Sequence, residues 1–404
     1  MSARADRTGS GPRRPFLRAA WTLAIALAAV LVVKIFVGDV KHVDSGSMAP
    51  TILGSREDGE SVLVLYGAFE PERFDFAVIT LEGESVPLVK RIVGLPTESV
   101  RIANGDLLID GRRLPPSAPR PAPVAVFDDR FQSVAEGFER PRGEDARWTR
   151  GSAEWSLDAR DLAPDSDAGL MTFHRRLSDG YLDRDGSSVA GEVDVHDGIF
   201  ECEVRLGDPP GRTIVDLVEQ GDDFRFVLEP RSPGTAQASI VRRGAGGPEE
   251  TLATRLVTLA PGAWTKVRCS NVDNALAFEV SGAPEALCAE YAENRYDAAD
   301  RLKEGKSYGP RARFGGTGGR LEIRSIRVLR DLEYTPRDVH GVKTPADLGP
   351  DEYFVLGDHS AESRDSREWG PVRRARIVGR PVAVVWPLSH ARWLSPTVPG
   401  PCGR

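Results

Sequence analysis

The sequence predicts a mostly β protein in which one N-terminal transmembrane helix precedes a β domain that is split by an inserted β-sandwich. Three observations lead to this prediction. A long apolar run near the N-terminus has the length of a membrane span. Short runs rich in β-branched residues follow it, and runs of the same texture return near the C-terminus. Between them, many short alternating segments are separated by Gly, Pro, Asp and Asn turns, as in a β-sandwich.

Length and composition restrict the class of protein. A chain of 404 residues is long for one core and suggests two domains with appendages. Hydrophobic residues make up 40% and charged residues 28%, a balance typical of folded globular proteins. The net charge of -7, without a concentrated basic face, argues against nucleic acid as a partner. For Cys202, Cys269 and Cys288 two interpretations stay open: a disulfide among them outside the cytoplasm, or buried free thiols.

The predicted membrane span covers residues 19–37, which read AAWTLAIALAAVLVVKIFV and contain one charge, Lys34. At about 1.5 Å per residue such a helix crosses a hydrocarbon core of roughly 30 Å. The basic tail before it, residues 1–18, carries five arginines. The positive-inside rule therefore places this tail in the cytoplasm and all later residues outside a cell membrane crossed once. A cleaved secretory signal is the competing interpretation, and the long run without a small-x-small cleavage site argues against it.

The β domain is predicted in two parts, residues 38–115 and 333–404. The first part contains three strand-like runs and then ANGDLLIDGRRL, a hairpin with turns at Asn104-Gly105 and Asp110-Gly111. A proline-dense linker follows at residues 116–125. Runs of strand texture return in EYFVLGDHS and IVGRPVAVVWPL. Since domain insertions succeed at exposed loop tips, the simplest account is one β domain interrupted by an insert.

The insert is predicted over residues 126–332. Phrases such as DGIFECEVRL and GGRLEIRSIRVLRDLEY resemble a concanavalin-like or laminin-G-like jelly roll. That resemblance implies a domain that binds glycan or protein. Trp148, Trp155 and Trp264 are candidates to stack on sugar rings, although packing in the core is the commoner fate of tryptophan in a sandwich.

Neither a metal nor another cofactor is predicted. The four cysteines are widely spaced and lack a CxxC pair, which argues against a structural zinc or iron–sulfur site. His174 and His196 lie near Asp194 and Asp197 in the sequence. No third ligand at fixed spacing accompanies them, so solvated strand-edge charges are the better interpretation.

The chemistry is carried by two segments after the apolar run. SGSMAPT, residues 45–51, offers a serine, which needs a base within hydrogen-bond reach and donors for the developing oxyanion. PLVKRIVGLP, residues 87–96, offers Lys90 between apolar neighbours. A lysine acts as a base only when it is neutral, and burial among apolar groups lowers its pKa toward that state.

These segments resemble type I signal peptidases. SGSMAPT is similar to the serine box of that family, PLVKRIVGLP to its lysine box, and VLGDHSAESRDSREWG, residues 355–370, to its third box. RFDFAVI, residues 73–79, resembles the strand that family members write Arg-Gly-Asp-hydrophobic, and IVGRPVAVVWP resembles the closing strand. All of these segments occur in the order of the family.

The resemblance implies a membrane-bound serine endopeptidase that removes signal peptides from secreted preproteins after small residues. Ser47 would be the nucleophile and Lys90 its general base. Ser45 would donate its hydroxyl to the oxyanion together with the Ser47 backbone N–H, and Ser363 would orient the Lys90 amine. The implied partners are preprotein signal peptides and the lipid bilayer, with the catalytic domain outside the cell membrane.

Further residues are implied by the same match. Four charged residues would scaffold the site, with ordinary surface ion pairs as the alternative: Arg91, Asp358, Asp365 and Arg367. Four apolar residues fall where the family lines shallow pockets for small residues at the first and third positions before the cut: Val43, Met48, Ile52 and Val89.

The sequence departs from the family pattern in two places. The third box usually runs Gly-Asp-Asn-Arg-Asp-Asn-Ser, whereas residues 357–363 read GDHSAES. Phe74 replaces a glycine, which leaves the conformation of that turn open. His42 and His359 offer an alternative histidine base, which the lysine in its own box argues against.

Two other functions stay open at this point. The altered third box and the large insert are compatible with a membrane-tethered binding protein, glycan-binding for example, that uses an inactive peptidase scaffold. A specialised Ser/Lys peptidase acting on a narrow set of partners is the other.

Overall fold

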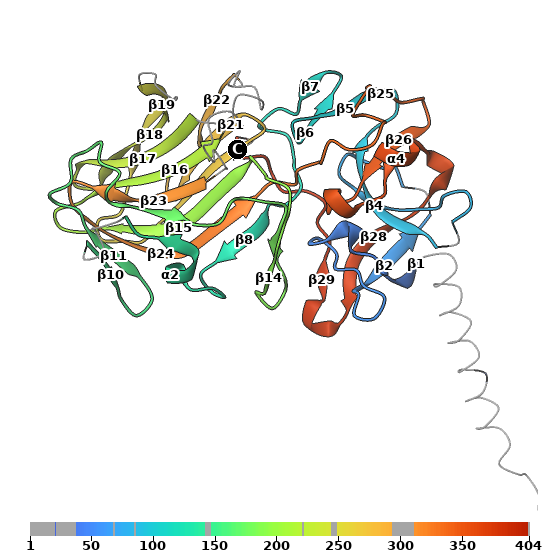
Figure 1. The fold of residues 1–404 in the computed structure, drawn as a ribbon, viewed down its shortest axis with the longest axis horizontal. Helices are drawn as coiled ribbons and strands as arrows, with labels where there is room; N and C mark the ends of the chain where they lie inside the picture. The colour runs from blue at the N-terminus through green and yellow to red at the C-terminus, as the bar shows by residue number, and fades with distance from the viewer. Residues whose placement is uncertain are drawn as a thin grey trace, which may run out of the picture.

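Strands dominate the structure, a computed structural model that describes Trp21 and residues 38–402 apart from residues 68, 85, 142–146, 220–221, 244–248 and 293–310. Among the described residues from 38 onward, the helices are single turns between these strands (Figure 1), so the prediction of a mostly β protein is confirmed. The predicted membrane span, residues 19–37, lies outside the described residues except for Trp21. Within the described part of the chain, no helix is long and apolar enough to cross a bilayer.

The first sheet combines strands from the two ends of the chain. Its order is β1-β2-β28-β3-β4-β26-β27, and β29 pairs with β28. The C-terminal strand β28 thus lies between two N-terminal strands, and β26 pairs with β4. Strands are confirmed in all five strand-like runs of the predicted β domain, three in its first part and two in its second. The bounds are β1 Gly38–His42, β2 Ser61–Tyr66, β3 Phe76–Ile79, β4 Leu88–Gly94, β26 Glu352–Leu356, β27 Val372–Arg373, β28 Ile377–Trp386 and β29 Arg392–Trp393.

A small second sheet has the order β25-β5-β6-β7. Its bounds are β5 Ser99–Ala103, β6 Asp106–Ile109, β7 Arg112–Arg113 and β25 Ala346–Asp347. Both predicted turns are present, with positive φ at Asn104, Gly105, Asp110 and Gly111. Two-residue hairpin turns of this kind need positive φ at both central residues, which Asn-Gly and Asp-Gly tolerate best. The predicted hairpin is therefore confirmed.

The middle of the chain forms two sheets that face each other across one apolar core (Figure 1). One sheet has the order β10-β11-β24-β15-β20-β21-β22, with β8 on β24; the other has the order β19-β18-β17-β16-β23-β12-β9. Aromatic rings join the two sheets, since Phe200 of β15 stacks on Phe314 of β23 with ring centroids 5.2 Å apart. The bounds are β8 Val124–Asp128, β9 Phe138–Glu139, β10 Trp148–Arg150, β11 Trp155–Asp158, β12 Leu170–Phe173, β15 Gly198–Leu206, β16 Arg212–Glu219, β17 Asp222–Ser232, β18 Thr235–Arg243, β19 Glu249–Thr258, β20 Thr265–Val272, β21 Ala275–Val280, β22 Leu287–Glu290, β23 Arg311–Thr317 and β24 Arg320–Arg330.

The sandwich refines two sequence predictions. Strand β8 begins at Val124, so it includes the last two residues of the segment that the sequence assigns to the proline-rich linker. Trp148 and Trp155 are buried in the apolar core, which confirms core packing over sugar stacking for these two. The Trp264 ring lies against the guanidinium groups of Arg205 and Arg324, at 4.7 and 4.1 Å from the ring centroid.

The cysteines follow neither sequence interpretation completely. Cys202 and Cys269 are buried free thiols of the sandwich core, as one alternative predicted. Cys288 of β22 instead forms a disulfide with Cys402, with Cα atoms 6.2 Å apart. The proposed disulfide among the three sandwich cysteines is therefore wrong. The bridge that is present ties the sandwich to the C-terminal segment.

Carboxylates gather where the small sheet meets the sandwich, in a group that we call the acidic seam: Asp106, Asp197, Asp273, Asp331 and Glu333. Oxygens of the first three lie within 4.8 Å of one another. Arg113 donates to Asp106 at 2.5 Å and Arg120 donates to Asp273, so two of these carboxylates already face a cation. The seam is therefore a partly neutralised cluster between two sheets.

Burial changes the ionisation of the acidic seam. The pKa of Asp197 is raised well above its usual value, chiefly because the group is buried and secondarily because Asp106 lies nearby. Burial likewise raises the pKa of Asp331, and it raises the pKa of Glu333 to about 8. In this part of the protein the folded state holds protons that an unfolded chain would release.

Candidate active site

Ser47 lies in a tight turn that follows β1. Residues Gly46–Met48 form one 3-10 turn, in which the Ala49 N–H donates to the Gly46 carbonyl at 2.9 Å. The Ile52 N–H donates to the Met48 carbonyl, also at 2.9 Å, and the Met48 side chain is fully buried. These hydrogen bonds and the buried Met48 side chain hold the turn in place. We call residues 45–51 the serine loop.

Lys90 lies in the middle of β4, opposite Ala77 of β3, and is only 2% exposed. Its Nζ is 2.7 Å from the Ser47 Oγ and 3.1 Å from the Ser363 Oγ. The Ser45 Oγ is 3.3 Å from the Ser47 Oγ. Three segments that are far apart in the sequence thus bring one amine and three hydroxyls together.

Burial lowers the pKa of Lys90 from 10.5 to about 8. Asp365 and Asp358 act in the opposite direction, while Arg367 and Arg337 reinforce the lowering. Because each carboxylate faces its own guanidinium, the negative charge available to hold the lysine proton is small. At neutral pH roughly one lysine in ten is then neutral, and this fraction rises steeply with pH.

Arg91 follows Lys90 on β4 and points to the opposite face of the strand. Its guanidinium donates two hydrogen bonds to Asp358, at 2.7 and 2.6 Å, and both side chains are buried. The Thr51 hydroxyl donates to the same carboxylate at 2.5 Å. Asp358 therefore links the lysine strand to the end of the serine loop.

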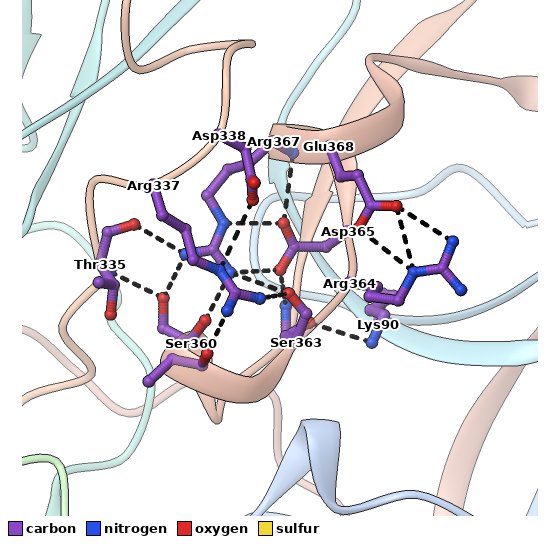
Figure 2. Close-up of polar contacts among 12 residues, drawn as sticks. Lys90, Thr335, Arg337, Asp338, Ser360, Ser363, Arg364, Asp365, Arg367 and Glu368 are labelled. Carbon is purple, nitrogen blue, oxygen red and sulfur yellow. Dashed lines mark hydrogen bonds and ion pairs between the residues drawn. The ribbon is translucent and has the colours of Figure 1, made fainter. Parts of the chain in front are cut away.

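A second buried ion pair holds the loop that carries Ser363 (Figure 2). Arg367 donates to Asp365 at 2.8 and 2.7 Å. The same guanidinium donates to the Ser360 hydroxyl at 2.7 Å and to the Thr335 carbonyl at 2.8 Å. Asp365 also caps the single helical turn Ser366–Trp369, through the Arg367 N–H. This network fixes residues 357–365, which we call the third-box loop.

The third-box loop packs directly on the serine loop. The His359 N–H donates to the Ser47 carbonyl at 3.1 Å. A Cβ on Gly357 would lie 2.2 Å from the Ser363 Oγ and 2.4 Å from the Ser47 carbonyl oxygen. Only glycine fits here, because both loops approach its backbone.

Comparison with known proteins now identifies the family. A model of the family described as signal peptidase, peptidase S26, matches residues 16–145 and 285–386, which together make up more than half of the chain. The chain belongs to this signal peptidase family. The unmatched stretch between the two segments falls within the sandwich.

Curated relatives carry the same family name. The chain is 28% identical over 135 residues to the probable signal peptidase I-2 of Synechocystis, covering 30% of this chain and 61% of that protein. It is 36% identical over 97 residues to signal peptidase I S of Bacillus subtilis, covering 23% of this chain and 50% of that protein. The chain thus spans between half and about three fifths of these signal peptidases.

Solved structures are similar only to a low degree. A β-glucanase of Bacillus licheniformis aligns with 51% of this chain and 97% of its own, with a TM-score of 0.31 and 10% identity. A carbohydrate-binding module, CBM66, of Bacillus subtilis aligns with 48% of this chain and 92% of its own, with a TM-score of 0.27 and 8% identity. Neither similarity assigns a ligand to the sandwich.

The structure places every predicted residue of the peptidase site around Ser47 and Lys90 or in the layer behind them. The four scaffold residues are buried in two ion pairs, so the alternative of ordinary surface pairs is wrong. The predicted pocket residues share one apolar cluster, in which Met48 and Ile52 are fully buried, Val43 is nearly so and Val89 is partly exposed. Their role in binding substrate stays a prediction.

The two candidate histidine bases have other partners. The His42 Nε2 lies 2.9 Å from the Ser55 carbonyl oxygen. The His359 ring packs edge-on against Tyr181, with centroids 6.3 Å apart, and its Nδ1 lies 3.7 Å from Glu362. Among the described contacts of Ser47, the nitrogen that reaches its hydroxyl belongs to Lys90.

Phe74, which replaces the family glycine, keeps the left-handed backbone of that turn with φ 71°. Such a conformation costs a bulky residue on the order of 1 kcal/mol or more. The Phe74 side chain is buried in an apolar cluster, and its carbonyl accepts a hydrogen bond from Arg91 at 3.0 Å. Packing therefore offsets the strain, and the conformation that the sequence left open is the glycine-like one.

Sequence reasoning missed several residues of the site. Ser360 stands where the family box has arginine, and its hydroxyl accepts from Arg367 while also accepting from the Thr335 N–H at 2.8 Å. Arg337 donates to the carbonyls of Ala361 and Ser363. The departure of the third box from the family pattern was the sequence signal that could have identified Ser360. Thr335 and Arg337 lie outside every recognisable motif, so only the folded chain identifies them.

Proposed function

We propose that this member of the signal peptidase family is a membrane-bound serine endopeptidase that removes signal peptides from secreted preproteins after small residues. Ser47 is the nucleophile and Lys90 the general base. The observation that carries this proposal is the buried Lys90 Nζ, 2.7 Å from the Ser47 Oγ. A base at this distance, with a pKa near 8, meets both the geometric and the protonation requirement for activating a serine.

In the acylation step, neutral Lys90 takes the Ser47 proton while the Oγ forms a bond to the scissile carbonyl carbon. The Ser45 hydroxyl and the Ser47 backbone N–H donate to the oxyanion that develops. Protonated Lys90 then passes its proton to the departing amine as the C–N bond breaks. Ser363, 3.1 Å from the Nζ, keeps the amine aimed at Ser47 throughout.

In the deacylation step, a water molecule occupies the place left by the amine. Lys90 takes a proton from this water while its oxygen attacks the acyl carbon. The bond to the Ser47 Oγ then breaks, and the lysine proton returns to the serine. The net reaction is hydrolysis of one peptide bond, with both residues restored.

Substrate selection belongs to the apolar side of the serine loop. Val43, Met48, Ile52 and Val89 share one apolar cluster, in which Met48 and Ile52 are fully buried and Val89 is partly exposed. We assign to this cluster the shallow pockets for alanine-sized side chains that the family resemblance implies.

Membrane attachment rests on two features. Residues 19–37 form the proposed anchor, with the N-terminus in the cytoplasm and the catalytic residues outside. Three large apolar side chains are exposed between the end of β28 and the end of β29. Trp386 is 59% exposed, Leu388 74% and Trp393 79%. Exposed tryptophans are typical of surfaces that rest in the headgroup region. The Cys288–Cys402 disulfide also fits an oxidising compartment outside the cytoplasm.

The test is cleavage of a model presequence with alanine at the first and third positions before the cut, using the full chain in detergent. We expect Ser47→Ala and Lys90→Met each to lower kcat/KM by about a thousandfold or more. Lys343→Met, at an exposed lysine, is the matched control and keeps wild-type activity. Full activity in the Lys90 variant would reject the proposed base. Binding to a glycan array without cleavage of any presequence would favour the binding-protein alternative.

A further inference from the structure

A groove opens beside Ser47 between the peptidase loops and the sandwich. Its volume is about 720 Å³, and Gly46 and Ala49 of the serine loop form part of its wall. His359 and Ala361 of the third-box loop line it as well. The opposite wall comes from the sandwich, in a two-stranded hairpin made of β13 Tyr181–Leu182 and β14 Ser188–Val189. We call residues 181–189 the clamp hairpin.

The clamp hairpin projects from the flank of the sandwich that faces the first sheet, where β14 is labelled in Figure 1. Arg184 in its turn donates to the Pro50 carbonyl at 2.7 Å and to the Thr51 carbonyl at 3.2 Å. Its Nε lies 3.6 Å from buried Glu60. The sandwich therefore holds the serine loop by its backbone, only three and four residues after Ser47.

The contact of Arg184 continues toward the proposed base. Thr51, whose carbonyl it holds, donates its hydroxyl to Asp358 at 2.5 Å. Asp358 in turn pairs with Arg91, the neighbour of Lys90 on β4. Arg392 donates to the same Thr51 carbonyl at 2.7 Å, so two guanidinium groups fix this end of the loop.

Tyr181 gives the clamp hairpin a second contact. Its ring packs edge-on against His359, with centroids 6.3 Å apart. The backbone N–H of His359 donates to the Ser47 carbonyl at 3.1 Å. The hairpin thus touches both loops that meet at the nucleophile.

We propose that the clamp hairpin of the sandwich completes the active site, with Arg184 as a positioning residue for Ser47 and the hairpin flank as a wall that selects cationic substrate segments. This inference rests on the proposed Ser47/Lys90 peptidase. Under this proposal the sandwich contributes residues to the active site and is not a separate binding module.

The charge of the groove defines the substrate class. Among the described residues, the lining of the groove contains no lysine or arginine, and it contains five carboxylates: Asp58, Asp179, Asp183, Glu192 and Glu362. Because Gly46, one residue before Ser47, and Ala49, two residues after it, line the groove, we infer that one arm of a bound substrate runs along it. A substrate arm with lysine or arginine gains charge-assisted contacts there, and an arm with aspartate or glutamate is repelled.

The two roles affect different kinetic constants. A serine loop released from Arg184 lets the Ser47 Oγ drift from its 2.7 Å distance to Lys90, which slows the chemical step and lowers kcat. The acidic wall acts on substrate affinity and therefore on KM. The expected split separates positioning from specificity.

The experiment uses the full chain in detergent and compares Arg184→Ala, Arg184→Lys and the matched control Arg176→Ala. Arg176 also lies in the sandwich, is mostly exposed, and pairs with Asp194 instead of the serine loop. We expect Arg184→Ala to lower kcat about tenfold with KM nearly unchanged, Arg184→Lys to restore part of kcat, and the control to behave as wild type. Where the alanine variant unfolds at a lower temperature than the control, kcat is measured well below that temperature, and a wild-type kcat in Arg184→Ala overturns the positioning role.

The acidic wall is tested with presequences that carry two lysines or two glutamates on either side of the cut. We expect the lysine substrate to have the lower KM on one side of the cut, and Asp183→Asn with Glu192→Gln to reduce that preference several-fold. Equal KM values for both substrates in the wild type overturn the cationic preference. Activity that survives in Ser47→Ala would instead refute the underlying peptidase proposal, so the two failures are distinguishable.

Discussion

The active site and the acidic seam both bury ionised side chains, and they do so in opposite ways. Around Lys90, each buried carboxylate has a guanidinium of its own, in the pairs Arg91–Asp358 and Arg367–Asp365. In the acidic seam, carboxylates from two sheets crowd together, and arginines face two of them, Asp106 and Asp273. One region neutralises its charges with ion pairs, and the other keeps protons on its acids.

The comparison shows how burial shifts the pKa of a lysine and the pKa values of acids in opposite directions within one chain. Because the site carboxylates are committed to arginines, burial dominates at Lys90 and its pKa falls to about 8. In the acidic seam burial dominates as well, and the pKa of Glu333 rises to about 8. Raising the pH through this range therefore frees the proposed base while it strips protons from the seam.

The largest effect is expected from breaking a pair in the site. Arg91→Ala leaves Asp358 buried without its guanidinium, which should lower the free energy of unfolding by about 3–5 kcal/mol. The matched control is Arg364→Ala, whose pair with Glu368 is exposed to solvent and therefore contributes little to stability. Denaturant titration of both variants checks this. Equal losses in the two variants would show that the buried pair has no special role.

The next effect concerns the cost of burying Lys90 in its protonated form. Because its pKa is lowered from 10.5 to about 8, protonated Lys90 lowers the free energy of unfolding by about 3 kcal/mol below pH 8, at about 1.4 kcal/mol per pKa unit. This destabilisation decreases as the pH rises from 8 toward 10.5. Lys90→Met should therefore be inactive yet more stable than wild type at pH 7, by about 1–2 kcal/mol after loss of its hydrogen bonds. Unfolding at pH 7 and pH 10 measures this gain. A variant less stable than wild type at pH 7 contradicts it.

The pH profile of cleavage tests the same pKa through activity. A general base acts when it is unprotonated, so kcat/KM should rise about tenfold per pH unit below the pKa of Lys90 and level off above about pH 8. The measurement uses the model presequence in detergent between pH 5.5 and 9.5, values chosen to bracket the roughly two-decade rise. A profile that is flat from pH 6 upward would exclude a base with this pKa.

The smallest effect belongs to the acidic seam. The raised pKa of Asp197 stabilises the fold at low pH, where the acid holds its proton, and this contribution is lost as the pH rises through the pKa of the folded state. Asp197→Asn keeps the acceptor for the Asp273 N–H and removes the titration. We expect it to raise stability at pH 8 by up to about 1 kcal/mol and to change little at pH 5. A larger gain at pH 5 than at pH 8 would reverse the assigned sign.

Local chemistry made much of the first sheet and its hairpin predictable. The turns at Asn104-Gly105 and Asp110-Gly111 need positive φ, which their residue types favour without help from distant contacts. Runs rich in β-branched residues likewise located the strands, because such side chains favour the extended backbone of a sheet. The Cys288–Cys402 bridge was missed because it depends on where β22 meets the C-terminal segment, and sequence spacing does not encode that meeting.

The sequence by itself determined the family and pointed to Ser47, Lys90 and their supporting residues, because the proposed reacting groups lie in short motifs whose residue types the chemistry restricts. Only the tertiary structure decided which side chains surround them. Arg337 and Arg184 act through contacts with backbone carbonyls, and any segment that reaches those carbonyls can supply such a contact. No local pattern marks a residue of that kind, so the role of the sandwich beside the nucleophile becomes visible only in the folded chain.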